Sequence, residues 1–303
     1  MFNKFIAAIL PYFPKKLIWI FSRPYISGEL IEDAIRASME MNNKNMKTTL
    51  DVLGEFITTL EEAELNKMEY LKLIDVSYEN AIDGNFSLKP TSFGLLIDKE
   101  ICLDHIREIV TKAASYKGFI RIDMEDSPCT DLEIEIFRKL KMEFPANVGL
   151  VIQAYLKRTL QDMEDMLDLN TLKNPLNFRL CKGIYIENEA IAYKKHNEIN
   201  QHFLEDLEFM FKNNMYVGIA THDKLLIDGA YSLIEKNNVP KDKYEFQMLY
   251  GVTPKLRESV VNEGHKMRVY VPFGKQWFGY STRRLKENPK MASHIIKAIF
   301  YKG

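Results

Sequence analysis

The sequence of 303 residues predicts an α/β barrel of eight strands. Short apolar or β-branched segments alternate eight times with helical segments, which is typical of parallel βαβ units. No Gly-X-Gly-X-X-Gly motif follows the first predicted strand, so the dinucleotide fingerprint of an open, doubly wound sheet is missing. Eight units without that fingerprint favour a closed barrel.

The strands are predicted from apolar and β-branched runs that turn signals separate. They cover Lys47–Leu53, Asn85–Lys89, Gly118–Met124, Val148–Ala154, Asn177–Cys181, Tyr216–Thr221, Tyr244–Leu249 and Met267–Val271. The clearest helical patterns between them cover Ile57–Glu79, Lys99–Tyr116, Leu132–Glu143 and Glu189–Asn213. Another helix is predicted before the first strand, from just after Gly28 to about Met41.

After the last strand, Pro272 and Gly274 interrupt the strand pattern, and a helix that stops at Pro289 is predicted to follow. This helix carries Arg283 and Arg284, whose guanidinium groups suit bidentate capture of a carboxylate. Aromatic residues lie close by in the sequence, so the region predicts a pocket for a small anionic substrate with an apolar body. The alternative is a solvated basic helix face with ordinary i,i+4 charge pairs. The aromatic residues are Tyr270, Trp277 and Tyr280.

Composition and charge exclude several classes of protein. Hydrophobic residues make up 46% of the chain and charged residues 27%, as in an ordinary globular protein. The net charge of −1 gives no electrostatic footprint for nucleic acid. Cys102, Cys129 and Cys181 are widely spaced, which favours a reducing, cytoplasmic compartment over a disulfide framework. His196 and His202 have the wrong offset for a metal pair on one helix face, so we expect no metal site and surface histidines.

Residues 1–45 are predicted to form an N-terminal helical arm, and residues 46–303 the barrel. Residues 1–28 carry Lys4, Lys15, Lys16 and Arg23 with no acidic residue. The apolar runs among them are too short to span a membrane. Such a basic, aromatic-rich stretch either lies on an anionic membrane surface or caps the barrel with its apolar side inward, and the sequence leaves both open.

Polar side chains gather where the predicted strands end, which is where barrel enzymes carry their active sites. Buried ionisable groups cost free energy unless they are paired or used. A satisfied buried polar role is the better interpretation for Asp51 and Glu245 taken singly, but the whole set indicates a site for a sizeable polyanionic ligand. The set comprises Asp51, Lys89, Asp123, Glu125, Gln153, Tyr155, Arg179, Lys182, Tyr185, Thr221, His222, Asp223, Glu245, Gln247 and Tyr270.

Several of these strand ends resemble consecutive motifs of the proline dehydrogenase family. They read Ile120–Glu125 (IRIDME), Val151–Arg158 (VIQAYLKR), Phe178–Tyr185 (FRLCKGIY), Ala220–Asp223 (ATHD), Tyr244–Gly251 (YEFQMLYG) and the stretch from Tyr270 to Arg283-Arg284. The resemblance runs in order from about Thr49 to Pro289 and is closest to the short, monofunctional bacterial type. It implies a distorted βα barrel with FAD across its rim and the last helix over the barrel mouth.

The resemblance also implies an activity and partners. Family members oxidise L-proline to Δ1-pyrroline-5-carboxylate, the first step of proline catabolism to glutamate. Their electrons pass from FAD to a membrane quinone, and a separate pyrroline-5-carboxylate dehydrogenase takes the product onward. By this resemblance the protein is expected in the cytoplasm, peripherally on the inner face of the cytoplasmic membrane.

Residue roles follow from the same resemblance. Asp123 and Arg179 are the expected catalytic pair, with Arg179 near the flavin N5. Lys89, Arg283 and Arg284 are expected to hold the proline carboxylate, and Tyr185, Leu249 and Tyr270 to wall its ring. The residues expected to contact FAD are Met124, Gln153, Arg179, Lys182, Gly183, Ile184, Thr221 and His222. Three positions depart from the family pattern, where Ala, Val and Asn are usual: Ile184, Cys181 and Asp223.

Two other functions remain open from the sequence. A barrel aldolase or lyase places a nucleophilic lysine at a strand end, and Lys182 or Lys89 suits that role. A catalytically inactive barrel that serves as a membrane-surface scaffold is compatible with Ile184 and the basic N-terminal segment. A bound flavin distinguishes the dehydrogenase from both alternatives.

Overall fold

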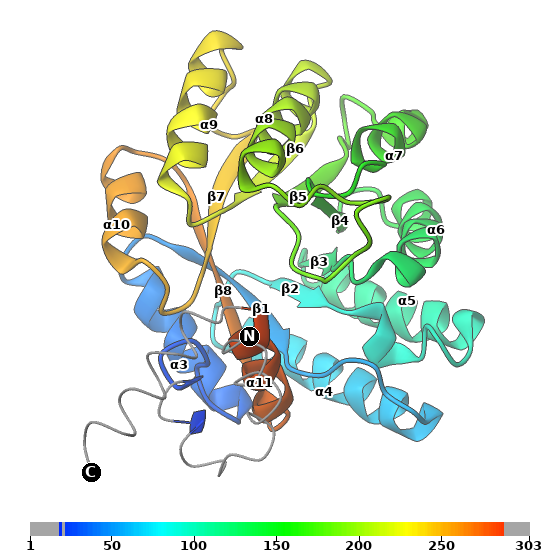
Figure 1. The fold of residues 1–303 in the computed structure, drawn as a ribbon. Helices are drawn as coiled ribbons and strands as arrows, with labels where there is room; N and C mark the ends of the chain where they lie inside the picture. Colours follow the sequence, from blue (N-terminus) through cyan, green and yellow to red (C-terminus); the bar gives the residue numbers. More distant parts are fainter. Residues whose placement is uncertain (1–17, 20–21, 288–303) are drawn as a thin grey trace, which may run out of the picture.

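The computed structural model describes residues 18–19 and 22–287, and for residues 283–287 it describes the backbone alone. The eight strands form a closed parallel barrel in the order β1 to β8, with β8 paired to β1 (Figure 1). This confirms the predicted barrel. The strands are β1 Lys47–Val52, β2 Asn85–Leu88, β3 Phe119–Ile122, β4 Val148–Gln153, β5 Asn177–Cys181, β6 Tyr216–Ala220, β7 Tyr244–Leu249 and β8 Met267–Phe273.

The helices surround the strands (Figure 1). They are α3 Ile31–Asn42, α4 Leu60–Glu79, α5 Lys99–Ser115, α6 Ser127–Glu143, α7 Thr159–Asp165, α8 His196–Lys212, α9 Lys224–Lys236, α10 Pro254–Asn262 and α11 Trp277–Glu287. Two short 3₁₀ helices, η2 Pro90–Phe93 and η3 Leu167–Leu169, lie in the connections. In the described part of the chain, no helix is long and apolar enough to cross a membrane.

Several element boundaries differ from the predicted ones, and three of the differences have local reasons. Helix α6 begins at Ser127, well before the predicted Leu132, because Pro128 occupies a first-turn position that needs no N–H donor. Helix α8 begins later than predicted because Asn188 accepts a hydrogen bond from the N–H of Ala190 and holds a turn there. Strand β8 continues through Pro272, whose carbonyl accepts from the N–H of Ser27 at 3.0 Å. That side of Pro272 faces away from β1, so the strand needs no N–H there.

The N-terminal segment meets the barrel where it can be described. Ser38 of α3 accepts a hydrogen bond from the hydroxyl of Thr48 in β1. Ile18 is fully buried, and Trp19 packs against Trp277 of α11 with ring centroids 4.8 Å apart. The predicted division at residue 45 remains a prediction, and residues 1–17, 20 and 21 lie outside the described part, as does Pro289.

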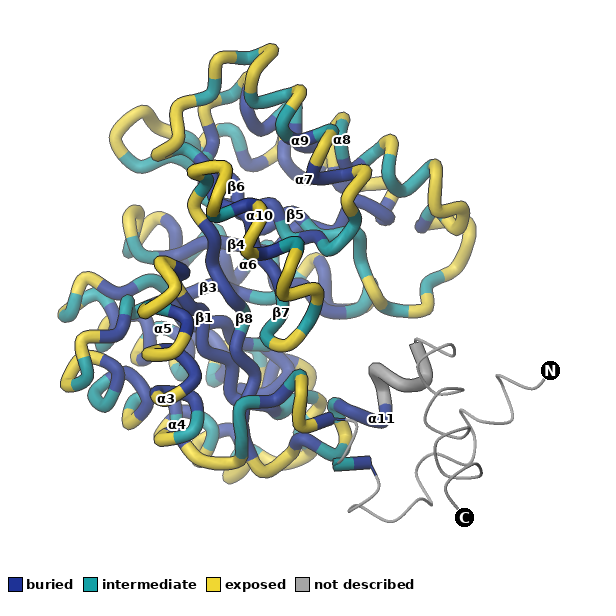
Figure 2. The backbone as a smooth tube through the Cα atoms, turned by 90° about the vertical axis from the view of Figure 1, so that its left-hand side faces the viewer, coloured by how far each residue is buried: buried dark blue, intermediate teal, exposed yellow. Residues whose placement is uncertain are grey.

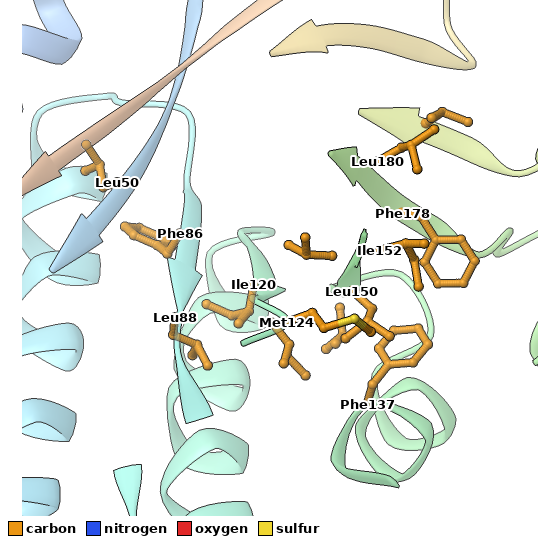
Figure 3. Packing of buried hydrophobic residues seen from close by; sticks show 14 of the residues in the cluster. Leu50, Phe86, Leu88, Ile120, Met124, Phe137, Leu150, Ile152, Phe178 and Leu180 are labelled. Atoms are coloured by element: carbon orange, nitrogen blue, oxygen red, sulfur yellow. The ribbon is translucent and has the colours of Figure 1, made fainter. Parts of the chain in front are cut away.

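Alternation along the strands separates an apolar shell from a polar barrel interior. Buried segments follow the strands and the inner sides of the helices, while exposed segments mark the outer turns (Figure 2). Phe137 of α6, for example, packs against Phe178 of β5 with ring centroids 6.0 Å apart. Strand residues that pack in this shell include Leu50, Phe86, Leu88, Ile120, Leu150, Ile152, Phe178 and Leu180 (Figure 3).

The intervening strand residues face the interior and are largely polar or charged. They hydrogen-bond to one another inside the barrel, as the Thr49 hydroxyl of β1 does to Asn85 Oδ1 of β2 at 2.6 Å. Gly149 and Gly218 face the interior and leave room for the long side chains of Arg121 and Gln247. A Cβ at Gly149 would lie 2.4 Å from a guanidinium nitrogen of Arg121. The interior is therefore packed with hydrogen-bonded polar groups, and the apolar core lies between the barrel and its helices.

One buried acid in the helical shell predicts a pH-dependent stability. Asp206 of α8 is 4% exposed, and its Oδ2 has no hydrogen-bond partner among the described residues. Burial, with a smaller contribution from Glu205, raises the pKa of Asp206 to about 7. A raised carboxyl pKa makes the folded state more stable below the unfolded pKa of about 3.9, and this contribution is lost as pH rises to about 7.

Asp206→Asn should therefore raise the free energy of unfolding at pH 8 by about 2–4 kcal/mol and change it little at pH 4. Urea unfolding at the two pH values measures this difference. Asp242→Asn, at an exposed position, is the matched control and should have no effect at either pH. An equal effect of Asp206→Asn at both pH values would contradict the assigned cause.

Candidate active site

A connected set of charged side chains lies at the C-terminal ends of the strands. Lys89, which follows β2, places its Nζ 3.2 Å from Oδ1 of Asp51 and 3.2 Å from Oδ2 of Asp123. The same ammonium lies 3.4 Å from the hydroxyl of Tyr270. Asp51, expected to be an ordinary buried polar residue, thus belongs to this network. One ammonium between two carboxylates gives the centre of the site a slight excess of negative charge before Arg179 is added.

The two carboxylates are held in different electrostatic states. Burial raises the pKa of Asp51, and Lys89 offsets only part of that effect. Burial would also raise the pKa of Asp123, but Lys89, Arg179 and a hydrogen bond from Ser87 outweigh it and hold that pKa below its usual value. For Lys89, burial opposes the charged form, yet the carboxylates and Tyr270 keep its pKa well above the usual value. Asp123 is thus the stable anion of the site and Lys89 its stable ammonium.

Asp123 is the point where several donors converge. It follows β3 and accepts hydrogen bonds from Ser87 Oγ at 2.5 Å, Arg179 Nη1 at 3.0 Å and the Tyr270 hydroxyl at 3.1 Å. Ser87 was not singled out from the sequence, because a serine within a strand carries no signal of its own. Its inward position in β2 becomes evident only once the register between β2 and β3 is known.

Arg179 of β5 is 6% exposed and crosses the barrel interior. Its Nε donates to Gln247 Oε1 at 2.6 Å, and its Nη1 donates to Ser87 Oγ at 2.9 Å and to Asp123. The guanidinium carbon lies 5.0 Å from the ring centroid of Tyr270. The remaining nitrogen, Nη2, is buried without a hydrogen-bond partner among the described residues. A buried cationic donor without a partner is available to a ligand.

A cavity of about 560 Å³ opens beside this network. It is lined by residues from the ends of β2 to β8 and by Tyr280 of α11, so this helix lies at the barrel mouth as predicted. Lys89 and Asp123 lie at one part of the lining, and Lys182 and Asp223 at another. A cavity of about 730 Å³ lies against Lys47 at the opposite ends of the strands, where barrel enzymes do not carry their active sites.

A second charged cluster borders the cavity beyond β5 and β6. Lys182 Nζ donates to Asp223 Oδ2 at 2.7 Å, and His196 Nε2 lies 3.0 Å from that ammonium. Asp223 also caps α9 by accepting from the N–H of Leu225 at 3.0 Å. His196, expected to be a plain surface residue, is exposed but takes part in this cluster. That contact could not be predicted, because Lys182 and His196 are fourteen positions apart and the connection between them folds back.

The backbone between the two clusters comes close to an aromatic ring. Gly183 has φ +99°, and a Cβ there would lie 2.1 Å from the ring of Tyr155. Only glycine fits both constraints. Ile184, one of the three residues that depart from the family pattern, is 41% exposed and lines the cavity. Its side chain therefore lies at the cavity and not in the buried core.

The residues to which the resemblance assigns a role, and whose side chains are described, all line this one cavity. Of the expected substrate residues, it brings together Lys89, Tyr185, Leu249 and Tyr270. The expected catalytic pair, Asp123 and Arg179, lies among them. Of the expected cofactor residues, the cavity is lined by Met124, Gln153, Lys182, Gly183, Ile184, Thr221 and His222.

Arg283 and Arg284 lie on α11, but their side chains are outside the described part of the structure. Glu245 does not reach the cavity wall and hydrogen-bonds to Arg268 at 2.7 Å, in agreement with its predicted buried polar role. Among the described residues, no group of three His, Cys, Asp or Glu side chains could hold a metal ion.

A closed parallel barrel with a titratable network and a cavity at the C-terminal strand ends defines a barrel enzyme. The sequence model of the family described as "Proline dehydrogenase" matches residues 34–297. Proline dehydrogenase 1 of Bacillus subtilis (strain 168) is 36% identical over 281 residues, which cover 93% of this chain and 91% of that protein. Proline dehydrogenase of Deinococcus radiodurans is 34% identical over 289 residues, which cover 94% of this chain and 92% of that protein.

A solved structure from a larger protein also resembles this chain. The crystal structure of proline utilization A from Bdellovibrio bacteriovorus, inactivated by N-propargylglycine, superposes with a TM-score of 0.81 at 26% identity. The match covers 89% of this chain and 33% of that larger one. The chain therefore belongs to the proline dehydrogenase family of enzymes.

Proposed function

We propose that this family member oxidises L-proline to Δ1-pyrroline-5-carboxylate with FAD as its resident cofactor, as the first step of proline catabolism to glutamate. The observation that supports it most is one cavity where Arg179 meets Asp123 and Lys89, and where Arg179 Nη2 has no hydrogen-bond partner among the described residues. Cations on one side of an apolar-walled pocket suit an amino acid whose carboxylate needs a counter-charge and whose ring needs apolar surface.

The residues present fit FAD by three features. Arg179 Nη2 is a buried cationic donor that lacks a partner among the described residues. Gly183 keeps the strand-end backbone free of a side chain. Lys182 and His196 supply positive charge or hydrogen-bond donors at the cavity edge, as phosphates require. The residues that would hold FAD are Met124, Gln153, Arg179, Lys182, Gly183, Ile184, Thr221 and His222. FAD, when bound, supplies the acceptor for the two electrons removed from the proline ring.

In this proposal the protein's own residues bind and orient the substrate. Lys89, with Arg283 and Arg284 of α11, holds the proline carboxylate. Tyr185, Leu249 and Tyr270 wall the ring, which fixes the ring carbon that is oxidised. Asp123 acts as the anion that keeps Lys89 and Arg179 in place, since each donates a hydrogen bond to it.

The rival Schiff-base reaction has less support from the geometry. A lysine nucleophile needs a lowered pKa, whereas the buried carboxylates beside Lys89 hold its pKa well above the usual value. Lys182 is tied to Asp223 at 2.7 Å. Both amines are thus paired with carboxylates in the structure.

The visible spectrum of the purified protein tests the proposed function. We expect a yellow flavin band that L-proline bleaches without oxygen, with one Δ1-pyrroline-5-carboxylate formed per flavin reduced. D-proline serves as the control substrate and should leave the band unchanged. A colourless protein, or borohydride trapping of substrate on Lys89 or Lys182, would favour the Schiff-base alternative.

For electron transfer onward, we propose a membrane quinone as acceptor and contact with the inner face of the cytoplasmic membrane through residues 1–28. The support is the charge of that segment, since four cations without an acid attract anionic lipid. Replacing Lys4, Lys15 and Lys16 by glutamine should weaken flotation with anionic vesicles and flatten its salt dependence. Flotation that is unchanged in this variant would leave the segment as a cap on the barrel.

A further inference from the structure

A chain of hydrogen bonds runs down the barrel interior from Arg179 to the opposite end. Arg179 Nε donates to Gln247 Oε1 at 2.6 Å, and Gln247 Nε2 donates to Glu245 Oε1 at 2.7 Å. Arg268 Nε donates to the same Glu245 oxygen at 2.7 Å, and its Nη1 donates to Asp83 Oδ2 at 2.8 Å. Arg179, Gln247, Glu245 and Arg268 are each less than 8% exposed.

The direction of the Gln247 amide is set by its two neighbours. The guanidinium of Arg179 requires an acceptor, and the carboxylate of Glu245 requires a donor, so only one orientation of the amide satisfies both. Burial opposes ionisation of Glu245, but Arg268 and Gln247 outweigh it and hold the pKa of Glu245 below its usual value. Glu245 is thus an anion that locks the amide oxygen of Gln247 toward Arg179.

Gly218 of β6 provides the space for this arrangement. It pairs with Glu245 in the strand register, and a Cβ built on it would lie 2.4 Å from Gln247 Nε2 and 2.8 Å from Gln247 Cδ. Any side chain at position 218 must therefore displace the Gln247 amide. Two sequence positions, 218 and 247, consequently control the same hydrogen bond to Arg179.

The consequence for Arg179 is a fixed orientation. Gln247 holds Nε, and Ser87 and Asp123 hold Nη1, so two separate anchors prevent rotation of the planar guanidinium. Nη2 is left without a partner among the described residues, in a side chain that lines the cavity. Without the hydrogen bond at Nε, the guanidinium is held only by its contacts at Nη1 and can rotate about them. Nη2 then no longer keeps one fixed direction.

We propose that Gln247, held by Glu245 and given room by Gly218, is a positioning residue that fixes Arg179 so that Nη2 faces the bound cofactor and substrate. This inference rests on the proposed oxidation of L-proline at this cavity. It assigns to Gln247 an effect on the reaction step, because a cation that is misplaced by about 1 Å no longer stabilises the charge that develops.

The test compares three variants with the wild-type holoenzyme. Gln247→Asn keeps an amide but withdraws it by one methylene, and Gly218→Ala pushes the amide from the other side. Thr49→Val is the matched control, because it removes another buried interior hydrogen bond, to Asn85, that does not reach Arg179. For each folded variant, kcat and KM for L-proline are measured, together with the flavin reduction potential by dye titration without proline.

We expect Gln247→Asn and Gly218→Ala to lower kcat by about 10–100-fold and to change KM by less than about threefold. Both should lower the flavin reduction potential, since a displaced cation stabilises the reduced flavin less. The two substitutions combined should cost little more than one alone, because they break the same contact. Thr49→Val should retain the wild-type values.

The inference is overturned if either folded variant keeps the wild-type kcat and reduction potential, or if Thr49→Val loses as much. The proposed function fails separately, if the wild-type holoenzyme is not reduced by L-proline. The reduction potential is measured without substrate, so it tests the positioning of Arg179 in either case.

Discussion

Arg179→Met is expected to lower kcat/KM for L-proline by about 10²–10³-fold, the effect of removing one preorganised charged donor from a buried site. Arg179 is the one buried cation of the network with an unpartnered donor among the described residues at the cavity. Its removal also leaves Asp123 with Lys89 as its remaining cationic partner in the described structure. Steady-state kinetics of the flavin-loaded variant measures the loss.

Arg138→Met is the matched control for Arg179→Met. Arg138 makes an exposed ion pair with Asp168 on the outer surface, and such pairs contribute at most about 1 kcal/mol. Its kinetics should equal those of the wild type. If Arg179→Met retains more than about a tenth of wild-type kcat/KM, the guanidinium does not stabilise the reacting groups.

Lys89→Met is expected to raise KM for L-proline by roughly 10–150-fold, because a hydrogen bond to a charged group contributes about 1.5–3 kcal/mol. Flavin content should change little. The control is Lys99→Met, which removes a half-buried surface ammonium paired with Glu135. A KM that stays within threefold of the wild-type value in Lys89→Met would exclude Lys89 as the carboxylate ligand.

The same variant should also acquire a pH-dependent stability. Without Lys89, burial acts on Asp51 and Asp123 without its main offsetting charge, so the folded-state pKa values of both rise. Raised carboxyl pKa values stabilise the folded state at low pH, and that stability is lost as pH rises through them. Lys89→Met should therefore lose more stability, relative to wild type, at pH 8 than at pH 5 in urea unfolding.

The strand order and closure of the barrel were predictable because they depend on periodicity, which the sequence displays directly. The largely apolar run from Val148 to Gln153, for example, begins directly after the turn signals Pro145 and Asn147. The predicted start of α6 at Leu132 was too late, because the helix already begins at Ser127, where Pro128 is tolerated in the first turn. Hydrophobic periodicity alone therefore does not predict where a helix begins when the first turn contains a proline.

The location of the site was predictable, because the C-terminal ends of all the strands of a parallel barrel meet at one rim. Asp123, Arg179 and Lys89 followed from that rule and from the resemblance. The direction of the Gln247 amide did not, because it depends on Glu245 and Arg179 arriving from opposite sides. The contact between His196 and Lys182 depends on how the connection after β5 folds back, for which the sequence holds no short-range signal.

The charged barrel interior has a consequence for how the chain folds. Arg268 of β8 donates to Glu245 of β7, to the carbonyl of Thr48 in β1 and to Asp83 just before β2, so the last strand supplies the counter-charge for acids made much earlier. An interior that closed without β8 would bury Glu245 without that partner, and an unpaired buried carboxylate costs several kcal/mol. Burial of the interior acids therefore requires β8 to dock between β7 and β1, which favours formation of the first and last strands in one cooperative transition.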